Sequence, residues 1–244
     1  PQVKSIFIFV TFALILSAFI KGSLGMGFST ICLAMLANVI ELKTAISIVV
    51  LPSMLSNVIV MIEAGNLRIS LKLFLSMMLA SIPGMVVGLQ LLKQTDNTLS
   101  ISILALVLIV YGCWGWANHQ FRIDDKFISK LNPLVGFTTG IVNGATGSQI
   151  FPVMPYLLSL NISKDVLVQT INLSFTLNSL IMLGFLYKMN SLDTDSIFTY
   201  ALGIVPVAIG VWLGGKVRKR IPEARFKRIV MVLIISLGLM LLIN

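Results

Sequence analysis

Two glycine-rich stretches interrupt an otherwise apolar chain and carry the side chains best able to bind a ligand. The first, "KGSLGMGFS", covers residues 21–29, and the second, "NGATGSQ", covers residues 143–149. Both combine glycines with hydroxyl or amide side chains, and a helix that restarts after such a break leaves free N–H groups at its N-terminus. Because helix N-termini carry partial positive charge, they bind anions. The two stretches therefore predict an anion-binding site.

The residues predicted to contact the ligand lie in these breaks or on spans near them. In the first half of the chain they are Lys21, Gly25, Gly27, Ser29 and Asn57; in the second half they are Asn143, Gly144, Thr146, Gly147, Ser148, Gln149, Gln169 and Asn178. Helices are expected to restart near residues 27–29 and 146–149, where Ser or Thr also serves as an N-cap. No residue is predicted to be catalytic.

Membrane packing offers an alternative role for several of these residues. Glycines spaced as GxxxG let two helices approach closely, and this spacing occurs in Gly84 with Gly88, Gly140 with Gly144, and Gly210 with Gly214. Packing is the expected role of the first and third pairs. Asn57 and Asn178 either bond across helices or donate to the substrate, because an amide in lipid needs a partner. Lys21 either completes the anion site or extends toward water.

The elements that position these residues form a repeat. An offset of about 120 residues aligns Gly25 with Gly144, Ser53 with Ser174, Asn57 with Asn178, Met61 with Met182, and Gly88 with Gly210. The halves are residues 1–117 and 132–244, joined by a linker loop at 118–131. Each half is expected to begin with two pieces too short to cross a bilayer comfortably, at 5–20 and 26–40, then at 133–143 and 150–160. Full spans follow at 45–62, 73–92 and 99–117, then at 166–187, 196–215 and 226–243.

Composition places the chain in the lipid bilayer. Of its 244 residues, 57% are hydrophobic and 11% are charged, and its mean hydropathy is +0.99. Apolar runs recur along the whole length, and a helix needs about 20 apolar residues to span a bilayer core. The fold class is therefore predicted as an all-α polytopic membrane protein. The net charge is +9, but the Lys and Arg residues lie in short loops where they set topology, so no nucleic-acid partner is expected.

The basic residues also distinguish two topologies. If each broken pair enters and returns on one side, each half crosses the membrane an odd number of times and the repeats are inverted. With the basic segment 216–228 in the cytoplasm, this arrangement places more of the 18 Lys and Arg residues inside than parallel repeats do. We therefore predict two inverted repeats, each a broken, re-entrant helical hairpin followed by three transmembrane helices. This arrangement predicts that both termini lie outside and that the loop 118–131 is cytoplasmic.

Other chemistries lack the residues that they need. His119 is the single histidine and lies in the central loop. Cys32 and Cys113 lie in apolar runs without a neighbouring His or Cys, which predicts neither a disulfide nor a metal site. A hydrolase would need a base beside its nucleophile within the spans, and Glu41 and Glu63 stand at span ends. We predict no enzyme activity, no metal and no cofactor.

The duplicated motifs resemble a known family. "GSLGMGFS" at residues 22–29 and "NGATGSQIFPVMPYL" at residues 143–157 are similar to the sulfite exporter TauE/SafE family, also called the TSUP transporters. The resemblance covers nearly the whole chain. It implies multi-pass transport in the bacterial inner membrane, with a small sulfur-containing or organic anion, such as sulfite or a sulfonate, as substrate.

The sequence thus predicts a membrane transporter, in the direction of export, whose two hairpin tips bind the anion at the repeat interface. Paired, interrupted segments at matching places in two repeats are typical of a transporter's binding site. The alternative is a non-transporting integral membrane assembly or accessory subunit, in which Asn57 and Asn178 hold helices together. The sequence is compatible with a homo-oligomer as well as with a monomer.

Overall fold

The described part of the chain consists of helices joined by short non-helical segments. The computed structural model describes residues 2–117, 122–188, 203–218 and 223–243, and no strand occurs in these ranges. The first half contains α1 (Gln2–Leu24), α2 (Phe28–Leu36), α3 (Leu42–Ala64), α4 (Leu67–Gln94) and α5 (Asn97–Trp116). The second half contains η1 (Asp125–Phe127), α6 (Ile128–Thr146), α7 (Val153–Leu158), α8 (Lys164–Lys188), α10 (Ile204–Arg218) and α11 (Glu223–Ile243).

Helix length and composition confirm the polytopic membrane class. Five described helices are long and apolar enough to cross a bilayer: Ile6–Leu24 within α1, then α3, α4, α5 and α8. Two shorter apolar helices, Ile204–Lys216 and Arg228–Ile243, follow them. The predicted spans 45–62, 73–92, 99–117 and 166–187 correspond to α3, α4, α5 and α8. Residues 196–202 of the predicted span 196–215 lie outside the described residues.

The first helix of each half is longer than predicted. α1 has 23 residues and α6 has 19, whereas the sequence predicted short pieces at 5–20 and 133–143. Lys21 and Gly22 lie inside α1, and Gly144 lies inside α6, so none of these three residues ends its helix. The helices stop instead near the left-handed glycines Gly25 (φ +81°) and Gly147 (φ +72°), a conformation that glycine adopts without steric cost. The pieces after the breaks are short, with nine residues in α2 and six in α7.

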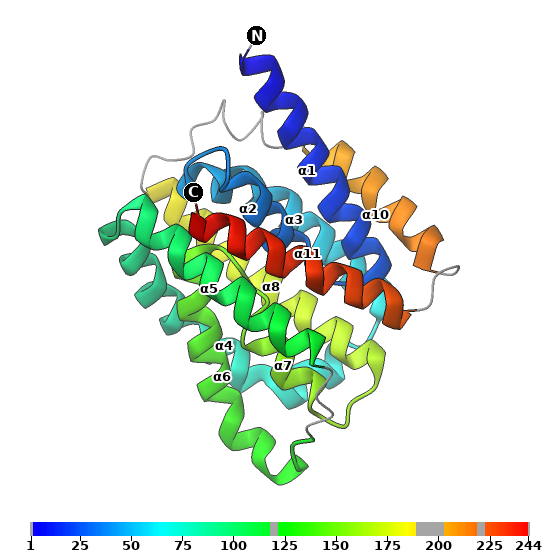
Figure 1. The fold of residues 1–244 in the computed structure, drawn as a ribbon. Helices are drawn as coiled ribbons and strands as arrows, with labels where there is room; N and C mark the ends of the chain where they lie inside the picture. The colour runs from blue at the N-terminus through cyan, green and yellow to red at the C-terminus, as the bar shows by residue number, and fades with distance from the viewer. Residues whose placement is uncertain (1, 118–121, 189–202, 219–222, 244) are drawn as a thin grey trace.

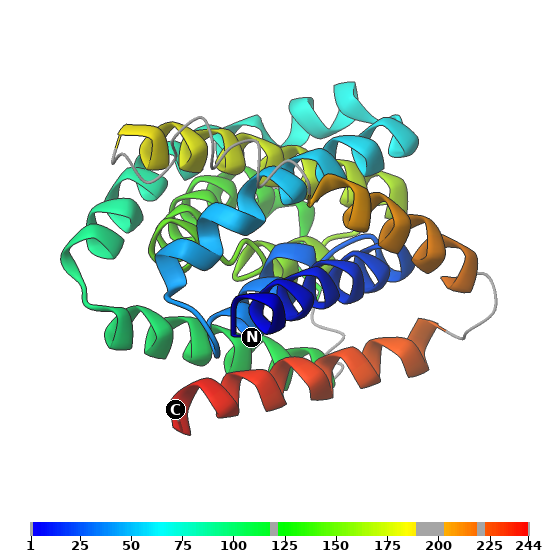
Figure 2. The ribbon, with the colours of Figure 1, turned by 90° about the horizontal axis from the view of Figure 1, so that it is seen from above.

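The two halves interleave rather than stand side by side. α1 packs along α10 and α4 packs along α6, so the first helix of each half lies against a later helix of the other (Figures 1 and 2). α3 pairs with α8, and α5 pairs with α11 in the same way. Each of these four pairs joins elements from different halves. The breaks after α1 and α6 are thereby enclosed between the halves.

Small residues allow this close packing. A Cβ added at Gly88 would lie 2.2 Å from the Ile141 carbonyl oxygen, and one at Gly140 would lie 2.3 Å from that of Ser81. On the α1–α10 contact, a Cβ at Gly214 would lie 2.1 Å from the Phe19 carbonyl oxygen. The packing role predicted for the pairs at 84 and 88 and at 210 and 214 is confirmed, and the pair at 140 and 144 packs in the same way.

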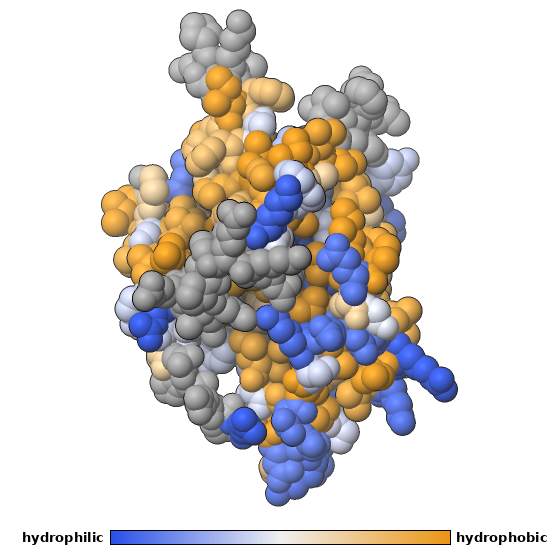
Figure 3. All heavy atoms as spheres, turned by 90° about the vertical axis from the view of Figure 1, so that its right-hand side faces the viewer, coloured by the Kyte–Doolittle hydropathy of each residue, from blue (hydrophilic) through white to orange (hydrophobic). Residues whose placement is uncertain are grey.

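The outer surface suits lipid contact. Apolar residues cover much of the face in Figure 3, and hydrophilic residues gather toward its lower half. Large apolar side chains such as Ile62, Trp212 and Ile229 are exposed, and the Lys216 ammonium lies 3.4 Å from the centre of the Trp212 ring. A continuous exposed apolar surface marks a membrane-contacting face.

The predicted linker 118–131 is partly helical. His119 lies outside the described residues, η1 occupies Asp125–Phe127, and α6 already begins at Ile128. Asp124 forms an ion pair of 2.8 Å with Lys126. Hydrogen bonding to the Lys126 side chain and backbone holds the pKa of the Asp124 carboxyl below its usual range.

Candidate functional site

At the first break the helix restarts where the sequence predicts, although α1 extends beyond the predicted end at residue 20. α1 ends at Leu24, Gly25 and Gly27 have positive φ angles of 81° and 93°, and α2 begins at Phe28. Gly27 is the N-cap, and no side chain caps this end of α2. The N-terminus of α2, with its partial positive charge, is therefore open toward the middle of the protein.

The second break differs from the prediction. The restart expected near residues 146–149 is wrong, because α6 ends at Thr146 and α7 begins only at Val153. The Thr146 hydroxyl donates to the Val142 carbonyl oxygen at 2.7 Å and accepts from the Ser148 N–H at 3.1 Å. Thr146 thus caps the C-terminus of α6. The polar groups that the second break offers to a ligand here are therefore side chains, not the free N–H groups of a helix N-terminus.

The two breaks meet in the interior. The hydroxyls of Thr30 on α2 and Ser148 in the second break are 3.0 Å apart and hydrogen bonded. The Asn172 side-chain nitrogen on α8 donates to the carbonyl oxygens of Val168, at 2.8 Å, and Gly25, at 3.4 Å. Residues 118 and 147 positions apart in the chain are therefore in direct contact.

A small cavity, here called the polar cavity, lies beside this meeting point. Its volume is about 10 Å³, and its lining comprises Ser29, Leu33, Ile46, Val49, Val50, Ser53, Asn143, Gly147, Gln149 and Met182. The predicted residues Ser29, Asn143, Gly147 and Gln149 are thus brought together. Ser53 also lines this cavity, although it was not among the predicted site residues, and its alignment with Ser174 in the repeat was the signal that could have identified it.

Several polar groups of the polar cavity lack a partner. Asn143 is buried, and neither its amide nitrogen nor its oxygen forms a hydrogen bond with a described residue. The Gln149 nitrogen donates to the Ser179 hydroxyl at 3.0 Å, whereas its oxygen is unpartnered among the same residues. A buried polar group without a partner costs about 1–3 kcal/mol. Such groups around a cavity are therefore expected to have a ligand in some state of the protein.

Lys21 is buried beside this region, so the alternative that it extends to water is wrong. Its side chain is 2% exposed, and its Nζ donates to the Ser56 hydroxyl at 3.0 Å and to the Asn57 side-chain oxygen. Within the described ranges the one ion pair is Lys126 with Asp124, so no carboxylate there neutralises Lys21. An anion nearby favours the charged form of a lysine that is buried in this way.

The other predicted residues do not line the polar cavity. Asn178 accepts from the Ser81 hydroxyl at 2.9 Å, which is an interhelical bond between α8 and α4. The side-chain nitrogens of Asn57 and Asn178 have no partner among the described residues, nor does the Gln169 oxygen. A Cβ at Gly144 would lie 2.6 Å from the Met85 carbonyl oxygen, so Gly144 packs against α4.

Together these features define a class of protein. Helices that break at matching places in two halves, and meet around a buried polar cavity inside an apolar bundle, are typical of membrane transporters. A family model described as sulfite exporter TauE/SafE matches residues 10–241, and the chain belongs to this family. The resemblance drawn from the glycine-rich motifs is confirmed.

Membership of the family implies a membrane exporter of sulfite or another anion, whose partners are an anionic substrate and the lipid bilayer. No curated protein matches the chain, and no solved structure matches it.

Proposed function

We propose that this protein exports a small sulfur-containing or organic anion, such as sulfite or a sulfonate, across the bacterial inner membrane. The observation that carries the proposal is the buried amide of Asn143, which has no hydrogen-bond partner among the described residues and lines the polar cavity between the two breaks. An anion there receives hydrogen bonds from the Asn143 nitrogen and the hydroxyls of Ser29 and Ser53. Neutral donors of this kind orient an anion without holding it too tightly for release.

Two further features supply positive potential. Ser29 lies in the first turn of α2, whose N-terminus attracts anions. Lys21 bonds to Asn57 on α3, one helical turn from Ser53. Because a buried positive charge without a carboxylate partner is costly, an anion in the polar cavity lowers this cost and is preferred over a neutral solute.

Transport requires the polar cavity to enlarge. A volume of about 10 Å³ is at the lower limit for a single water molecule, and sulfite is larger than water. In the proposed mechanism the two halves act as inverted repeats that rock against each other, and the Thr30–Ser148 hydrogen bond breaks as the cavity opens. An interior-negative potential favours anion exit by about 2.3 kcal/mol per charge per 100 mV, so export needs no coupling ion.

The test compares two asparagine-to-leucine variants of similar volume. Asn143→Leu removes the unpartnered amide, so it should weaken anion binding about tenfold or more while raising the unfolding temperature of the ligand-free protein. Asn132→Leu is the matched control, because the Asn132 amide is satisfied by Leu73 at 2.7 Å and Tyr156 at 2.8 Å. This control should lower the unfolding temperature and leave affinity per folded molecule unchanged.

The measurement is a thermal-shift titration of purified protein with sulfite, sulfate, thiosulfate, sulfonates and carboxylates, followed by export from proteoliposomes. Unchanged anion affinity in Asn143→Leu would contradict the assignment of the polar cavity. If no anion shifts the unfolding temperature of the unmodified protein, the chain is instead an accessory membrane subunit.

A further inference from the structure

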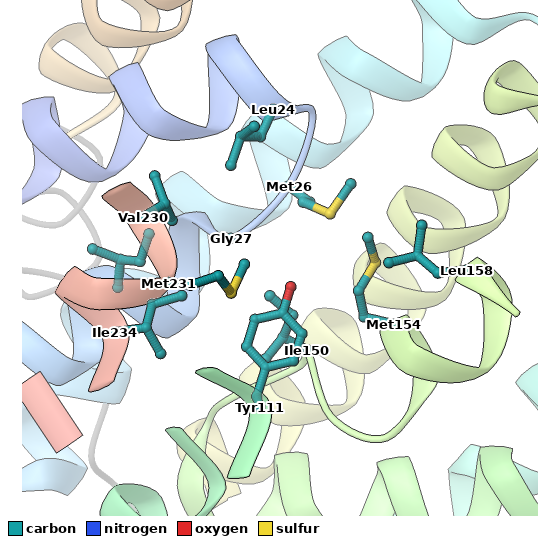
Figure 4. Close-up of a pocket in the computed structure, with 11 residues that line it drawn as sticks. Leu24, Met26, Gly27, Tyr111, Ile150, Met154, Leu158, Val230, Met231 and Ile234 are labelled. Atoms are coloured by element: carbon teal, nitrogen blue, oxygen red, sulfur yellow. The ribbon is translucent and has the colours of Figure 1, made fainter. Parts of the chain in front are cut away.

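A second cavity lies on the opposite face of α2 from the polar cavity. Gly27 and Ile31 line the second cavity, whereas Ser29 and Leu33 line the first; residues four apart share one face of a helix. The second cavity, here called the tyrosine pocket, measures about 80 Å³. Its remaining lining residues are Leu24, Met26, Tyr111, Ile150, Met154, Leu158, Val230, Met231 and Ile234 (Figure 4).

Tyr111 supplies one polar group to this apolar pocket. Its side chain is 2% exposed, and its ring stacks on Trp114 with centroids 6.3 Å apart. Its hydroxyl forms no hydrogen bond with the residues that the structure describes, and in Figure 4 it points into the pocket, toward the segment that carries Met26 and Gly27. Buried tyrosine hydroxyls usually have a partner, so this donor is available to a ligand.

The N-terminus of α2 faces the same pocket. Gly27, its N-cap, lines the tyrosine pocket, and no side chain caps the nine-residue helix. A free hydroxyl donor and a helix N-terminus at one side of a cavity favour a negatively charged group there.

The rest of the lining is aliphatic or thioether. Met26, Met154 and Met231 surround the pocket in Figure 4 together with Val230 and Ile234. Methionine side chains adapt their shape and suit ligands that vary in form. An inorganic anion such as sulfite has no apolar part to bury against this surface, whereas an organic anion does.

We infer that the tyrosine pocket binds an organic anion with a short apolar chain, such as an alkanesulfonate. The charged group lies at the Tyr111 hydroxyl and the N-terminus of α2, and the chain lies among the methionines. This inference rests on the proposed function and adds a second binding position for the transported anion, separated from the polar cavity by α2.

The pocket volume sets the length of the chain. At about 10–15 Å³ for each water-sized group, the scale used above for the polar cavity, 80 Å³ accommodates about five to eight such groups, which corresponds to a sulfonate group with a chain of about three carbons. Each buried methylene should tighten binding about fourfold, because its burial contributes about 0.8 kcal/mol. Affinity should therefore rise from methanesulfonate to propanesulfonate and then stop rising or fall at hexanesulfonate.

The experiment measures equilibrium binding of sulfite and of methane-, ethane-, propane- and hexanesulfonate to the purified protein. Val230→Phe fills the pocket and should abolish the increase in affinity with chain length. Val232→Phe is the matched control, because it adds the same bulk on the same helix at a side chain that is 46% exposed. Tyr111→Phe should weaken propanesulfonate about tenfold or more, whereas Tyr187→Phe, at an exposed tyrosine, should not.

The outcomes separate this inference from the proposed function. If sulfite binds but affinity does not depend on chain length, the tyrosine pocket is not an organic-anion site and the exporter proposal stands. Equal effects of Val230→Phe and Val232→Phe, in variants that stay folded by size-exclusion chromatography, would overturn the inference. An affinity that keeps rising up to hexanesulfonate would indicate lipid-like partitioning, and it would also overturn the inference. If neither sulfite nor any sulfonate binds, both proposals fail.

Discussion

Replacing Lys21 by methionine tests whether a buried charge selects the anion. Methionine has a similar length and no charge, so the variant keeps most of the packing of α1. It removes the hydrogen bonds from the Lys21 Nζ to Ser56 and Asn57. No carboxylate in the described segments pairs with Lys21, so the variant removes an amine whose charged form an anionic substrate would stabilise.

The size of the effect follows from the geometry of α3. Ser53 lines the polar cavity, and Asn57, which binds Lys21, is one helical turn or about 6 Å further along the helix. At a separation of about 8 Å and an effective dielectric constant near 20, two opposite unit charges attract by about 2 kcal/mol. Lys21→Met should therefore weaken sulfite binding about thirtyfold.

The assay is equilibrium binding of sulfite to protein purified in detergent, with size-exclusion chromatography to confirm folding. Lys93→Met is the matched control, since it makes the same chemical change at an exposed lysine near the end of α4. We expect less than a twofold change for this control, because exposed charges are screened. Sulfite affinity within threefold of the unmodified protein in a folded Lys21→Met variant would refute the role given to this lysine.

Two further predictions concern the packing that positions the site. Gly88→Ala should destabilise the protein by about 1–3 kcal/mol or prevent folding, because its Cβ would lie 2.2 Å from the Ile141 carbonyl oxygen. Gly184→Ala is the control with no atom within 4 Å of the added Cβ, and an equal loss of unfolding temperature in both variants would contradict this packing. Thr30→Val and Ser148→Ala should show a coupling energy of about 1 kcal/mol in a double-mutant cycle of chemical unfolding. Additive effects would mean that the two breaks are not joined by this bond.

Much of the fold could be predicted from the sequence because membrane spans have a strong compositional signal. The spans at α3, α4, α5 and α8 were found from their apolar length alone. A break near each glycine cluster was also predicted, and the glycines Gly25 and Gly147 adopt left-handed conformations there. Clustered glycines mark such a break because glycine adopts positive φ angles that other residues rarely adopt.

The extent of the helices around the breaks could not be predicted in the same way. Lys21 and Gly144 were expected in the breaks, yet both lie within regular helices. Contacts with neighbouring helices stabilise each residue there. Lys21 has Ser56 and Asn57 as partners, and Gly144 packs on the backbone of α4. Glycine alone does not show whether a helix stops or another helix approaches.

The sequence by itself determined the class of protein, the duplicated breaks and the residue types that meet there, because hydropathy and glycine content are local properties of the chain. Only the tertiary structure decided which of these residues share a cavity. Ser29 and Asn143 face the polar cavity while Tyr111 faces a separate pocket across α2, since the interleaved helices fix which face of each one is turned inward. It also decided that Lys21 is buried, because α3 supplies hydrogen-bond partners that no pattern in the neighbouring residues reveals.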